Sequence, residues 1–496
     1  MSVKQKYRIL SRSVPLLTFA PQKYTNTAIM TYLAAIVGCL MLYSRNMLTW
    51  YWWLFGLVEV LGFFYYANRQ TKLWYNVTPI SFAKKLFWTA FAIRIVWVFV
   101  SYGLYYNWTG TPFSIGAGDE LFYDDVGRYG ASQLLNGNWH IYDAIMEYAH
   151  PAFSDMGYPI FQTIIYYVLG NSILISRIIK AAFSAWTVVL MYKVAARNFG
   201  EHTGRMVGVF CFLMPNLIYY CGFQLKEIEM VFLTALFVER ADWLLRKSKL
   251  KLLPTAAVML IPGTLFMFRT ALAATLVLAF FMALLLSSGR VVSLGRRVLL
   301  IGAAGLFAAV MFFSSTSIGA EVSEMWETRG SNQQANMEWR SVREAGGKGM
   351  TQRFAKYAGA SVFAPMIFTL PFPTMTDVPE QENQKMIHGG NFVKNIISYF
   401  TIMALAVLLI TGDWRKYVLP IAILCGYLVI LVFSSFAHSE RFHQPILPLT
   451  LFFAAYGISV SKQYPWIRKY FPYWCVLMFL AAIGWNWFKL AGRGMI

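Results

Sequence analysis

The sequence has few cysteines and few charged residues, and both shortages exclude whole classes of protein. Charged residues make up only 13% of the 496-residue chain, against about 25% in ordinary soluble domains. The five cysteines lie scattered through apolar runs without paired spacing, which excludes a zinc motif and a disulfide framework. They are Cys39, Cys211, Cys221, Cys425 and Cys475.

Long apolar runs take up most of the chain. Hydrophobic residues are 58% of the sequence, including 17 Trp, 29 Tyr and 40 Phe. Runs of about 17 to 22 residues recur, and a helix of that length crosses the roughly 30 Å hydrocarbon core of a bilayer. The sequence therefore predicts an all-α polytopic membrane protein with about thirteen transmembrane helices and amphipathic interfacial helices in its outer loops. The predicted crossings are centred near residues 35, 57, 94, 184, 214, 235, 260, 279, 306, 403, 426, 453 and 479.

The charge balance is strongly basic, with 43 Lys and Arg against 23 Asp and Glu and a net charge of +20. Most basic residues lie in short loops between apolar runs, where they orient a membrane protein, so we expect no nucleic-acid partner. The pattern predicts an integral protein of the bacterial inner membrane with its N-terminus in the cytoplasm. The first 25 residues contain no long apolar core followed by a cleavage site, so we expect no removable signal peptide.

The titratable side chains gather on one side of the predicted topology. Most acids, and every histidine except His202, fall on the outward side. Chemistry is therefore expected on the periplasmic or exterior face. Two long loops face that way, residues 106–158 and residues 315–395. Two apolar stretches, 158–170 and 357–373, are too short or too interrupted by proline to span, so we expect them to be interfacial or re-entrant.

The first outer loop contains the stretch GDELFYDD, with Asp119 and Glu120 at the expected start of a helix that ends at Asn136-Gly137. The helical spacing of Leu121 and its apolar neighbours predicts an amphipathic helix lying on the membrane. Capping of free amides is one role for these two acids. The other is catalytic: Asp119 would act as a general base at the membrane surface, where a lipid-borne substrate arrives.

Two further groups of charged residues are expected at the outer ends of helices. The stretch FQLKEIEM places Lys226, Glu227 and Glu229 at such an end. Arg269, in LFMFRTALA, lies where two crossings meet with almost no loop between them. Charged side chains there can simply contact headgroups by snorkelling. A guanidinium is equally suited to bind the phosphate of a substrate.

The last group is FAHSERFHQP, in which His438, Glu440, Arg441 and His443 precede a late helix. The spacing matches no strong metal signature, so no metal ligands are assigned, although a divalent metal stays open. Arg269 and Arg441 with Lys226 would surround an anionic leaving group opposite Asp119. The candidate substrate-binding residues are Glu227, His438, His443 and Tyr158.

These stretches, in this order, resemble a known family. Residues 84–243 resemble the conserved half of the GT-C membrane glycosyltransferases, in the branch of the protein O-mannosyltransferases and the bacterial aminoarabinose transferase, glycosyltransferase family 39. The resemblance is carried by Arg94 within a helix, by GDELFYDDVGRYGASQLLNGN, by YPIFQTIIYYVLGNSILISRIIKAAFSAWTVVLMYKVAARNFG and by PNLIYYCGFQLKEIEMVFL. ERFHQPILPLTLFFAAYG is similar to the Arg-aromatic-x-x-Pro-x-x-Pro start of a late helix in these enzymes.

The resemblance implies the GT-C fold and an inverting transfer of a sugar from a polyprenyl-phosphate-linked donor to a glycan, lipid or protein acceptor on the outer face. It implies that Asp119 activates the acceptor, that Glu120 assists, and that Arg269 and Arg441 contact the departing phosphate. No organic cofactor is implied. Three departures leave the acceptor open: two helices precede the conserved unit, Phe442 follows Arg441 where the family has Tyr, and the loop 315–395 has no counterpart.

The resemblance also divides the chain into three parts. Residues 1–83 would be a basic tail with two additional helices. Residues 84–250 would be the catalytic half with the first outer loop, and residues 251–496 a variable transmembrane half with the long outer loop.

Two other functions stay open from sequence. A polysaccharide polymerase or ligase would use an oligosaccharide on a polyprenyl pyrophosphate, and it would release the pyrophosphate instead of the monophosphate. A lipid-sugar transporter or flippase would place ionisable groups near the bilayer midplane. The candidates for such groups are Glu59, Arg94, Arg177 and Lys180.

Overall fold

The computed structural model describes residues 15–246, 252–286, 365–379, 381–434 and 438–496, with a few single positions between 302 and 354. Within these ranges the regular secondary structure is helical, and the β contact found there is one isolated bridge between Met47 and Thr376. The prediction of an all-α chain is confirmed for this part of the molecule. The longer helices are α2 (Gln22–Tyr43), α3 (Trp50–Leu73), α4 (Pro79–Thr109), α5 (Gly118–Leu135), α7 (Phe153–Leu169), α8 (Ile173–Phe199), α9 (Glu201–Leu213), α11 (Glu227–Arg246), α12 (Leu252–Phe266), α13 (Thr270–Leu286), α17 (His388–Thr411), α18 (Val418–Phe433), α20 (Leu447–Val460) and α21 (Pro465–Ala491). Shorter elements are η1 (Ser44–Asn46), α6 (Ile141–Ala149), α10 (Pro215–Tyr219), η2 (Tyr220–Gly222), η4 (Glu382–Met386), η5 (Asp413–Lys416), α19 (Glu440–His443) and η6 (Gln444–Ile446).

Several of these helices have the length and composition of membrane spans. Among the described residues, five helices are long and apolar enough to cross a bilayer, or six if one bent pair counts as a single span. This fits a polytopic α-helical membrane protein, while the count of thirteen crossings stays a prediction. The predicted centre near residue 306 and most of the loop 315–395 lie outside the described residues. Each other predicted centre except that near residue 214 falls inside a helix.

The crossing predicted around residue 214 is not one straight helix, because the chain bends there by 53°. α9 ends at Leu213 and α10 begins at Pro215, whose ring cannot continue the preceding helix. Arg94 of α4 donates hydrogen bonds to the two carbonyls released at the break, those of Cys211 at 3.2 Å and Phe212 at 3.3 Å. Arg94 is completely buried. Its guanidinium supplies hydrogen bonds to the carbonyls that have no partner within the broken helix.

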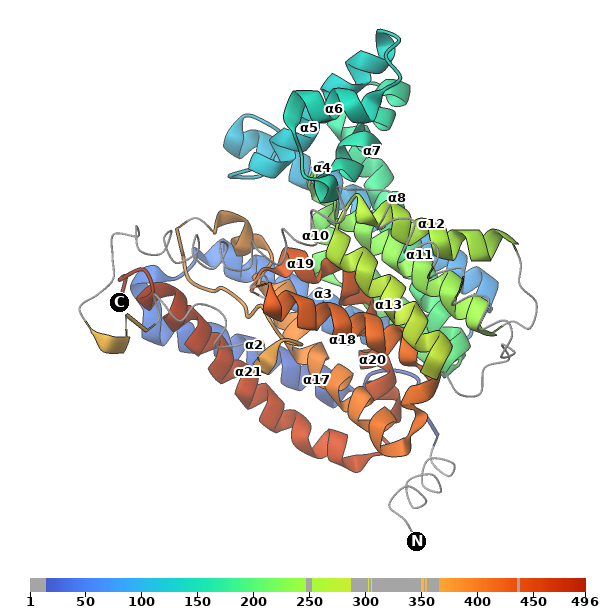
Figure 1. Ribbon diagram of the computed structural model, residues 1–496. Helices are drawn as coiled ribbons and strands as arrows, with labels where there is room; N and C mark the ends of the chain where they lie inside the picture. Colours follow the sequence, from blue (N-terminus) through green and yellow to red (C-terminus); the bar gives the residue numbers. More distant parts are fainter. Residues whose placement is uncertain are drawn as a thin grey trace.

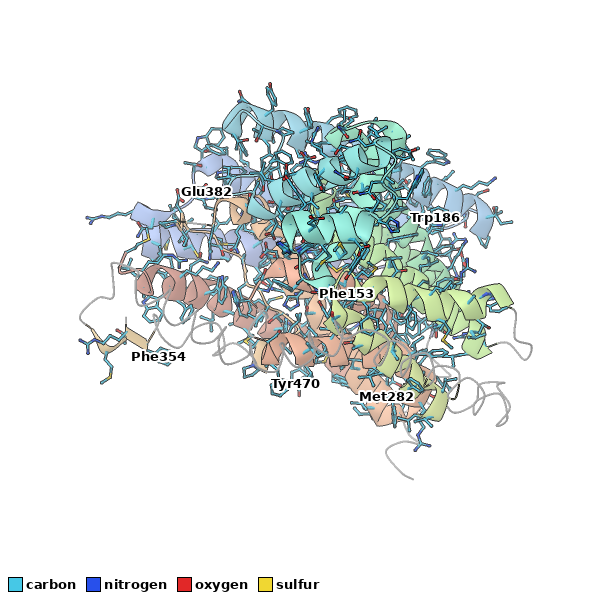
Figure 2. The ribbon with its side chains drawn as sticks, turned by 45° about the horizontal axis from the view of Figure 1, so that its top comes forward. Phe153, Trp186, Met282, Phe354, Glu382 and Tyr470 are labelled. Carbon is cyan, nitrogen blue, oxygen red and sulfur yellow. The ribbon has the colours of Figure 1, made fainter. Side chains whose placement is uncertain are left out.

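The helices pack into one main body. α17 packs against α20, α3 and α21, and α8 packs against α9, α4 and α11. α13 lies along α18, and α2 lies along α21, from opposite ends of the chain. Figure 1 shows α5, α6 and α7 projecting from one end of this body. When that end is turned forward, the cyan helices of the first outer loop come to the front, with Phe153 labelled near the centre (Figure 2).

α5 is the helix predicted in the first outer loop, and its existence is confirmed. It begins at Gly118, ends at Leu135 and packs against α7. Gly130 permits the close approach, because a Cβ there would clash with the side chain of Thr163 in α7. The apolar stripe is only partly as predicted: Val126 is buried, whereas Leu121 is 49% exposed. The stretch 158–170 becomes most of α7, which packs on α5.

An irregular segment, residues 369–376, is buried against α17 and α21. It includes the described end of the apolar stretch 357–373. Side-chain amides bond its backbone: Asn395 donates to the carbonyls of Thr369 and Pro371, and Asn486 accepts from the amides of Met375 and Thr376. Buried non-helical backbone is tolerated here because protein groups satisfy its hydrogen bonds.

α3 and α17 cross closely at Gly56, which gives a stability prediction. A Cβ at position 56 would clash with the ring of His388 and the hydroxyl of Tyr32, which are hydrogen-bonded to each other at 2.9 Å. We expect Gly56→Ala to lower the free energy of unfolding by about 1–3 kcal/mol, the usual cost of overpacking. Thermal unfolding of purified protein in detergent measures this. The control is Gly62→Ala on the same helix, where no described atom lies within 4 Å of an added Cβ. Equal unfolding temperatures for the two variants would contradict the close packing of α3 and α17 at Gly56.

Candidate functional site

Arg441 joins residues from three distant parts of the chain. It lies on the short helix α19, just before the prolines that begin η6 and α20. Its Nε donates to Oε1 of Glu227, the first residue of α11, and its Nη1 donates to Oδ2 of Asp119, in the first turn of α5. These charge-assisted contacts bring together residues that lie more than 100 positions apart in the sequence.

Arg269 is the second guanidinium of this cluster. It lies in the turn between α12 and α13, and its Nη2 is 3.9 Å from the same Oε1 of Glu227. Its Nη1 donates to the hydroxyl of Tyr427 at 3.3 Å, and its guanidinium lies over the ring of Phe442 at 4.3 Å from the centroid. Glu227 therefore holds two arginines, while its other oxygen, Oε2, is buried and has no hydrogen-bond partner in the part of the chain that the structure describes.

The charged cluster of Asp119, Glu227, Arg269 and Arg441 is open at one side. Side-chain exposure is 60% at Asp119, 22% at Arg441, 13% at Arg269 and 0% at Glu227. The exposed acid thus lies outermost and the buried acid innermost. Burial opposes the charge on Arg441, but Glu227 and Asp119 outweigh it and raise the pKa of Arg441 well above its ordinary value. The guanidinium stays charged at physiological pH.

Lys226 was predicted to bind the donor phosphate, and the structure places it in a neighbouring contact. Its Nζ donates to the carboxylate of Asp155, to the carbonyl of Ser154 at 3.0 Å and to the carbonyl of Phe268 at 2.6 Å. These three acceptors match the three protons of an ammonium group. Because Phe268 precedes Arg269, Lys226 fixes the turn that carries this arginine, and it joins that turn to the start of α7.

The acid of this ion pair, Asp155, also accepts a hydrogen bond from the hydroxyl of Tyr123 at 3.0 Å. Burial acts to raise the pKa of Asp155, but Lys226 and Tyr123 outweigh it and lower that pKa below its ordinary value near 3.8. Burial lowers the pKa of Lys226 to about 8, against the attraction of Asp155. Neither Asp155 nor Tyr123 was expected at this site from the sequence. The signal for Tyr123 was its position one helical turn after Asp119, on the same face.

The lowered pKa of Asp155 gives a prediction about acid stability. The carboxylate contributes stability above its ordinary pKa, and this contribution is lost as the pH falls through the lower value of the folded state. We therefore expect the unfolding temperature to fall more steeply between about pH 5 and about pH 3 in the wild type than in Asp155→Asn. Thermal unfolding across this range measures the slope. The exposed Asp143→Asn should keep the wild-type slope; parallel curves for wild type and Asp155→Asn would contradict the assignment.

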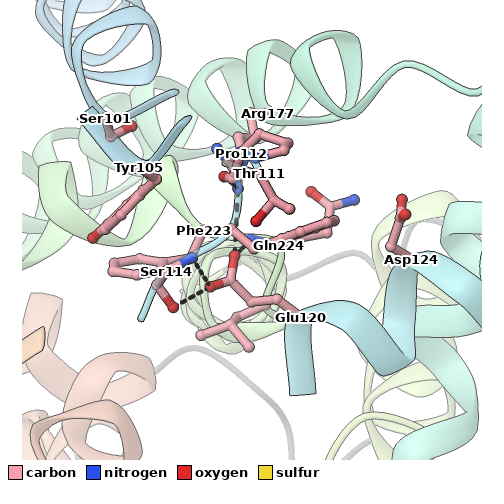
Figure 3. A network of polar contacts seen from close by, with 12 residues as sticks. Ser101, Tyr105, Thr111, Pro112, Ser114, Glu120, Asp124, Arg177, Phe223 and Gln224 are labelled. Carbon is pink, nitrogen blue, oxygen red and sulfur yellow. Dashed lines mark hydrogen bonds and ion pairs between the residues drawn. The ribbon is translucent and has the colours of Figure 1, made fainter. Parts of the chain in front are cut away.

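Glu120, the other predicted catalytic acid, is fully engaged inside the protein (Figure 3). It is 1% exposed and accepts hydrogen bonds from both the backbone N–H and the hydroxyl of Ser114. It also accepts from the backbone N–H of Gln224 at 2.7 Å and from Arg177 at 3.4 Å. Glu120 therefore ties the end of the α4–α5 connection to α8 and to the segment before α11. This anchoring fixes the backbone beside Asp119.

The four residues of the charged cluster include neither the other acids of α5 nor the remaining predicted residues. Asp124 pairs with Arg128 at 2.8 Å, and Asp125 accepts from Tyr148 at 2.9 Å. Tyr158 is completely buried and accepts from Lys180 at 2.9 Å. The two histidines differ: His438 is exposed, whereas His443 is buried at the end of α19.

No known protein family model, curated protein or solved structure matches this chain. Across the described ranges, no three His, Cys, Asp or Glu side chains are grouped so that they could hold a metal ion. The chemistry of the cluster is therefore argued from its own side chains. It presents one exposed carboxylate beside two arginines that a buried carboxylate holds together, an arrangement suited to an anionic group.

Proposed function

We propose that this protein is a membrane glycosyltransferase that moves a sugar from a polyprenyl-phosphate-linked donor to a glycan, lipid or protein acceptor, with inversion at the anomeric carbon. The observation that carries the proposal is the contact of Arg441 with both Asp119 and Glu227, beside Arg269. One bound substrate could therefore contact a base, Asp119, and two phosphate-binding groups, Arg269 and Arg441, at the same time. The resemblance to GT-C glycosyltransferases supports the same assignment.

The proposed step uses the exposed carboxylate as the base. Asp119 takes the proton of an acceptor hydroxyl, and the oxygen of that hydroxyl forms a bond to the anomeric carbon of the donor sugar. The bond between this carbon and the phosphate oxygen breaks, and the phosphate leaves with the electron pair. Attack on the face opposite the phosphate inverts the anomeric centre.

The two arginines would stabilise the charge that develops on the leaving phosphate. Arginine suits this task because its planar guanidinium forms directed, paired hydrogen bonds to phosphate oxygens. Such preorganised donors contribute typically a factor of about 10² to 10³ each in rate. Glu227 keeps both guanidiniums in place before the donor arrives, so little reorganisation is needed during the reaction.

A lipid donor sets where this chemistry takes place. Its phosphate stays at headgroup depth, so the arginines must lie near the membrane surface. In the predicted topology this surface is the outer face of the bacterial inner membrane, with the N-terminus in the cytoplasm. The basic residues of the short loops support that orientation.

Of the four charges predicted near the bilayer midplane, the three cations favour a transferase over a transporter. Arg94 bonds the broken end of α9, and Lys180 donates to Tyr158 and to the carbonyls of Phe223 and Leu225. Arg177 contacts the carbonyl of Pro112 and Glu120. These cations have partners within the protein, which accounts for their burial without a transported ion.

The class of donor tests this proposal. Membranes containing the protein are given a panel of polyprenyl-monophosphate sugars and polyprenyl-pyrophosphate oligosaccharides with a native acceptor fraction, and the lipids are analysed by mass spectrometry. We expect a monophosphate-linked sugar to be consumed. Consumption of pyrophosphate-linked donors alone would assign the protein to the polymerases or ligases, and consumption of neither would favour transport.

A further inference from the structure

The contact between Asp119 and Arg441 has an unexpected consequence for a catalytic base. Oδ2 of this carboxylate already accepts from Nη1 of Arg441, so at rest that oxygen is not available to accept from an acceptor hydroxyl. Resting on the proposed function, we infer that an incoming phosphate ester displaces Asp119 from Arg441, and that this displacement releases the carboxylate to act as the base. Binding of the donor and readiness of the base are then one event.

The two acids of the cluster differ in how readily they can leave Arg441. The Asp119 side chain is 60% exposed, so water replaces the hydrogen bond that it gives up. Glu227 is 0% exposed and would be left as a buried charge, with its nearest other cation, Arg269, at 3.9 Å. Asp119 is therefore the partner that is exchanged, and Glu227 is the partner that remains.

The geometry leaves a defined position for the phosphate. Arg441 uses Nε for Glu227 and Nη1 for Asp119, so loss of Asp119 releases the Nη side without disturbing the contact with Glu227. Oε2 of Glu227, the other oxygen of the carboxylate that both arginines contact, has no hydrogen-bond partner among the described residues, so it can still accept from a bound polar group. A hydroxyl of the donor sugar is such a group.

The charges also balance through the reaction. Without Asp119, the two arginines and Glu227 carry a net charge of +1, which matches the single negative charge of a sugar phosphodiester. As the sugar leaves, the phosphate gains negative charge while Asp119 becomes neutral by taking a proton. Once Asp119 has lost that proton to water, its carboxylate competes again for Arg441 and helps to expel the polyprenyl monophosphate.

Competition for Arg441 can be measured without any transfer reaction. The probe is farnesyl monophosphate, and its affinity for purified full-length protein in detergent is determined by isothermal titration calorimetry. Asp119→Asn removes the exposed ion pair that competes for Arg441, so we expect the Kd for farnesyl monophosphate to fall about two- to fivefold. Arg441→Gln should weaken binding at least about tenfold. Asp125→Asn, an exposed acid on the same helix that pairs with Tyr148, should leave the affinity unchanged.

Two further titrations test whether the bound phosphate belongs to a polyprenyl ester, to a membrane lipid or to free phosphate. Inorganic phosphate and phosphatidylglycerol are titrated alongside the farnesyl ester, and the inference expects the ester to bind best. Equal binding of either alternative would overturn the assignment to a polyprenyl phosphate. Unchanged or weaker binding of the ester by Asp119→Asn would overturn the displacement itself.

The binding result and the proposed function fail separately. Tighter binding by Asp119→Asn, with no sugar transferred from any donor, would support the displacement and reject the transferase. Sugar transfer by the wild type, without any gain in affinity in Asp119→Asn, would support the transferase and reject the displacement.

Discussion

Asp119→Asn is expected to lower kcat for sugar transfer by a factor of about 10² to 10⁴, the usual contribution of a general base. An amide of nearly the same shape cannot take the proton of the acceptor hydroxyl. The variant should fold normally, because the side chain is 60% exposed at the edge of the charged cluster. The rate is measured as release of polyprenyl monophosphate by purified protein, with donor and acceptor both saturating.

The control for this variant is Asp125→Asn. Asp125 lies on α5 as well, but it pairs with Tyr148 and not with an arginine. We expect its kcat to stay within about twofold of the wild type, the scale of an exposed polar change. Near wild-type turnover by Asp119→Asn would remove this residue from the role of base.

Arg441→Lys is expected to lower kcat/KM by a factor of about 10² to 10³, the cost of losing one preorganised donor to a developing anion. The substitution keeps the charge but removes the fork that contacts Glu227 with Nε and Asp119 with Nη1. The ammonium group of the new lysine is a single point of charge. It cannot hydrogen-bond Glu227 and a phosphate together, as a planar guanidinium can. Initial rates over a range of donor concentrations measure the effect.

Arg128→Lys is the matched control for this second prediction. Arg128 is a partly exposed arginine of α5 that pairs with Asp124 one turn earlier. Among the described residues its partners are Asp124 and the ring of Tyr166, which are not part of the charged cluster, so the kcat/KM of Arg128→Lys should stay at the wild-type value. If Arg441→Lys also retained wild-type kcat/KM, the leaving phosphate would not be held by this arginine.

The helices were largely predictable because their signal is local. Apolar runs of sufficient length form helices in a bilayer whatever their neighbours do, which placed α2, α4, α8, α17 and α21 correctly. The bend at residue 214 was not predicted, although Pro215 marks it in the sequence. The missing information was tertiary: Arg94, from another helix, makes the break tolerable by bonding the released carbonyls.

The charged cluster was predicted only in part, because charge shows what a residue can do and not which partner it has. Asp119, Arg441 and Arg269 were predicted to lie around one anionic group, and the structure brings these three residues together with Glu227. Glu227 was predicted to contact substrate, and the structure adds that it bridges two arginines. Glu120 has the same charge as its neighbour Asp119, yet its four hydrogen bonds inside the protein differ completely from those of Asp119.

If this chain transfers a sugar from a polyprenyl monophosphate, as we propose, the lipid that it releases is the decisive product. Purified protein in nanodiscs is supplied with a labelled polyprenyl-monophosphate sugar and its acceptor, and both products are counted by mass spectrometry. We expect one polyprenyl monophosphate to be released for each sugar transferred by the wild type, and none above background for Asp119→Asn within the same time. Glycosylated acceptor without released polyprenyl monophosphate, or equal release by both proteins, would contradict it.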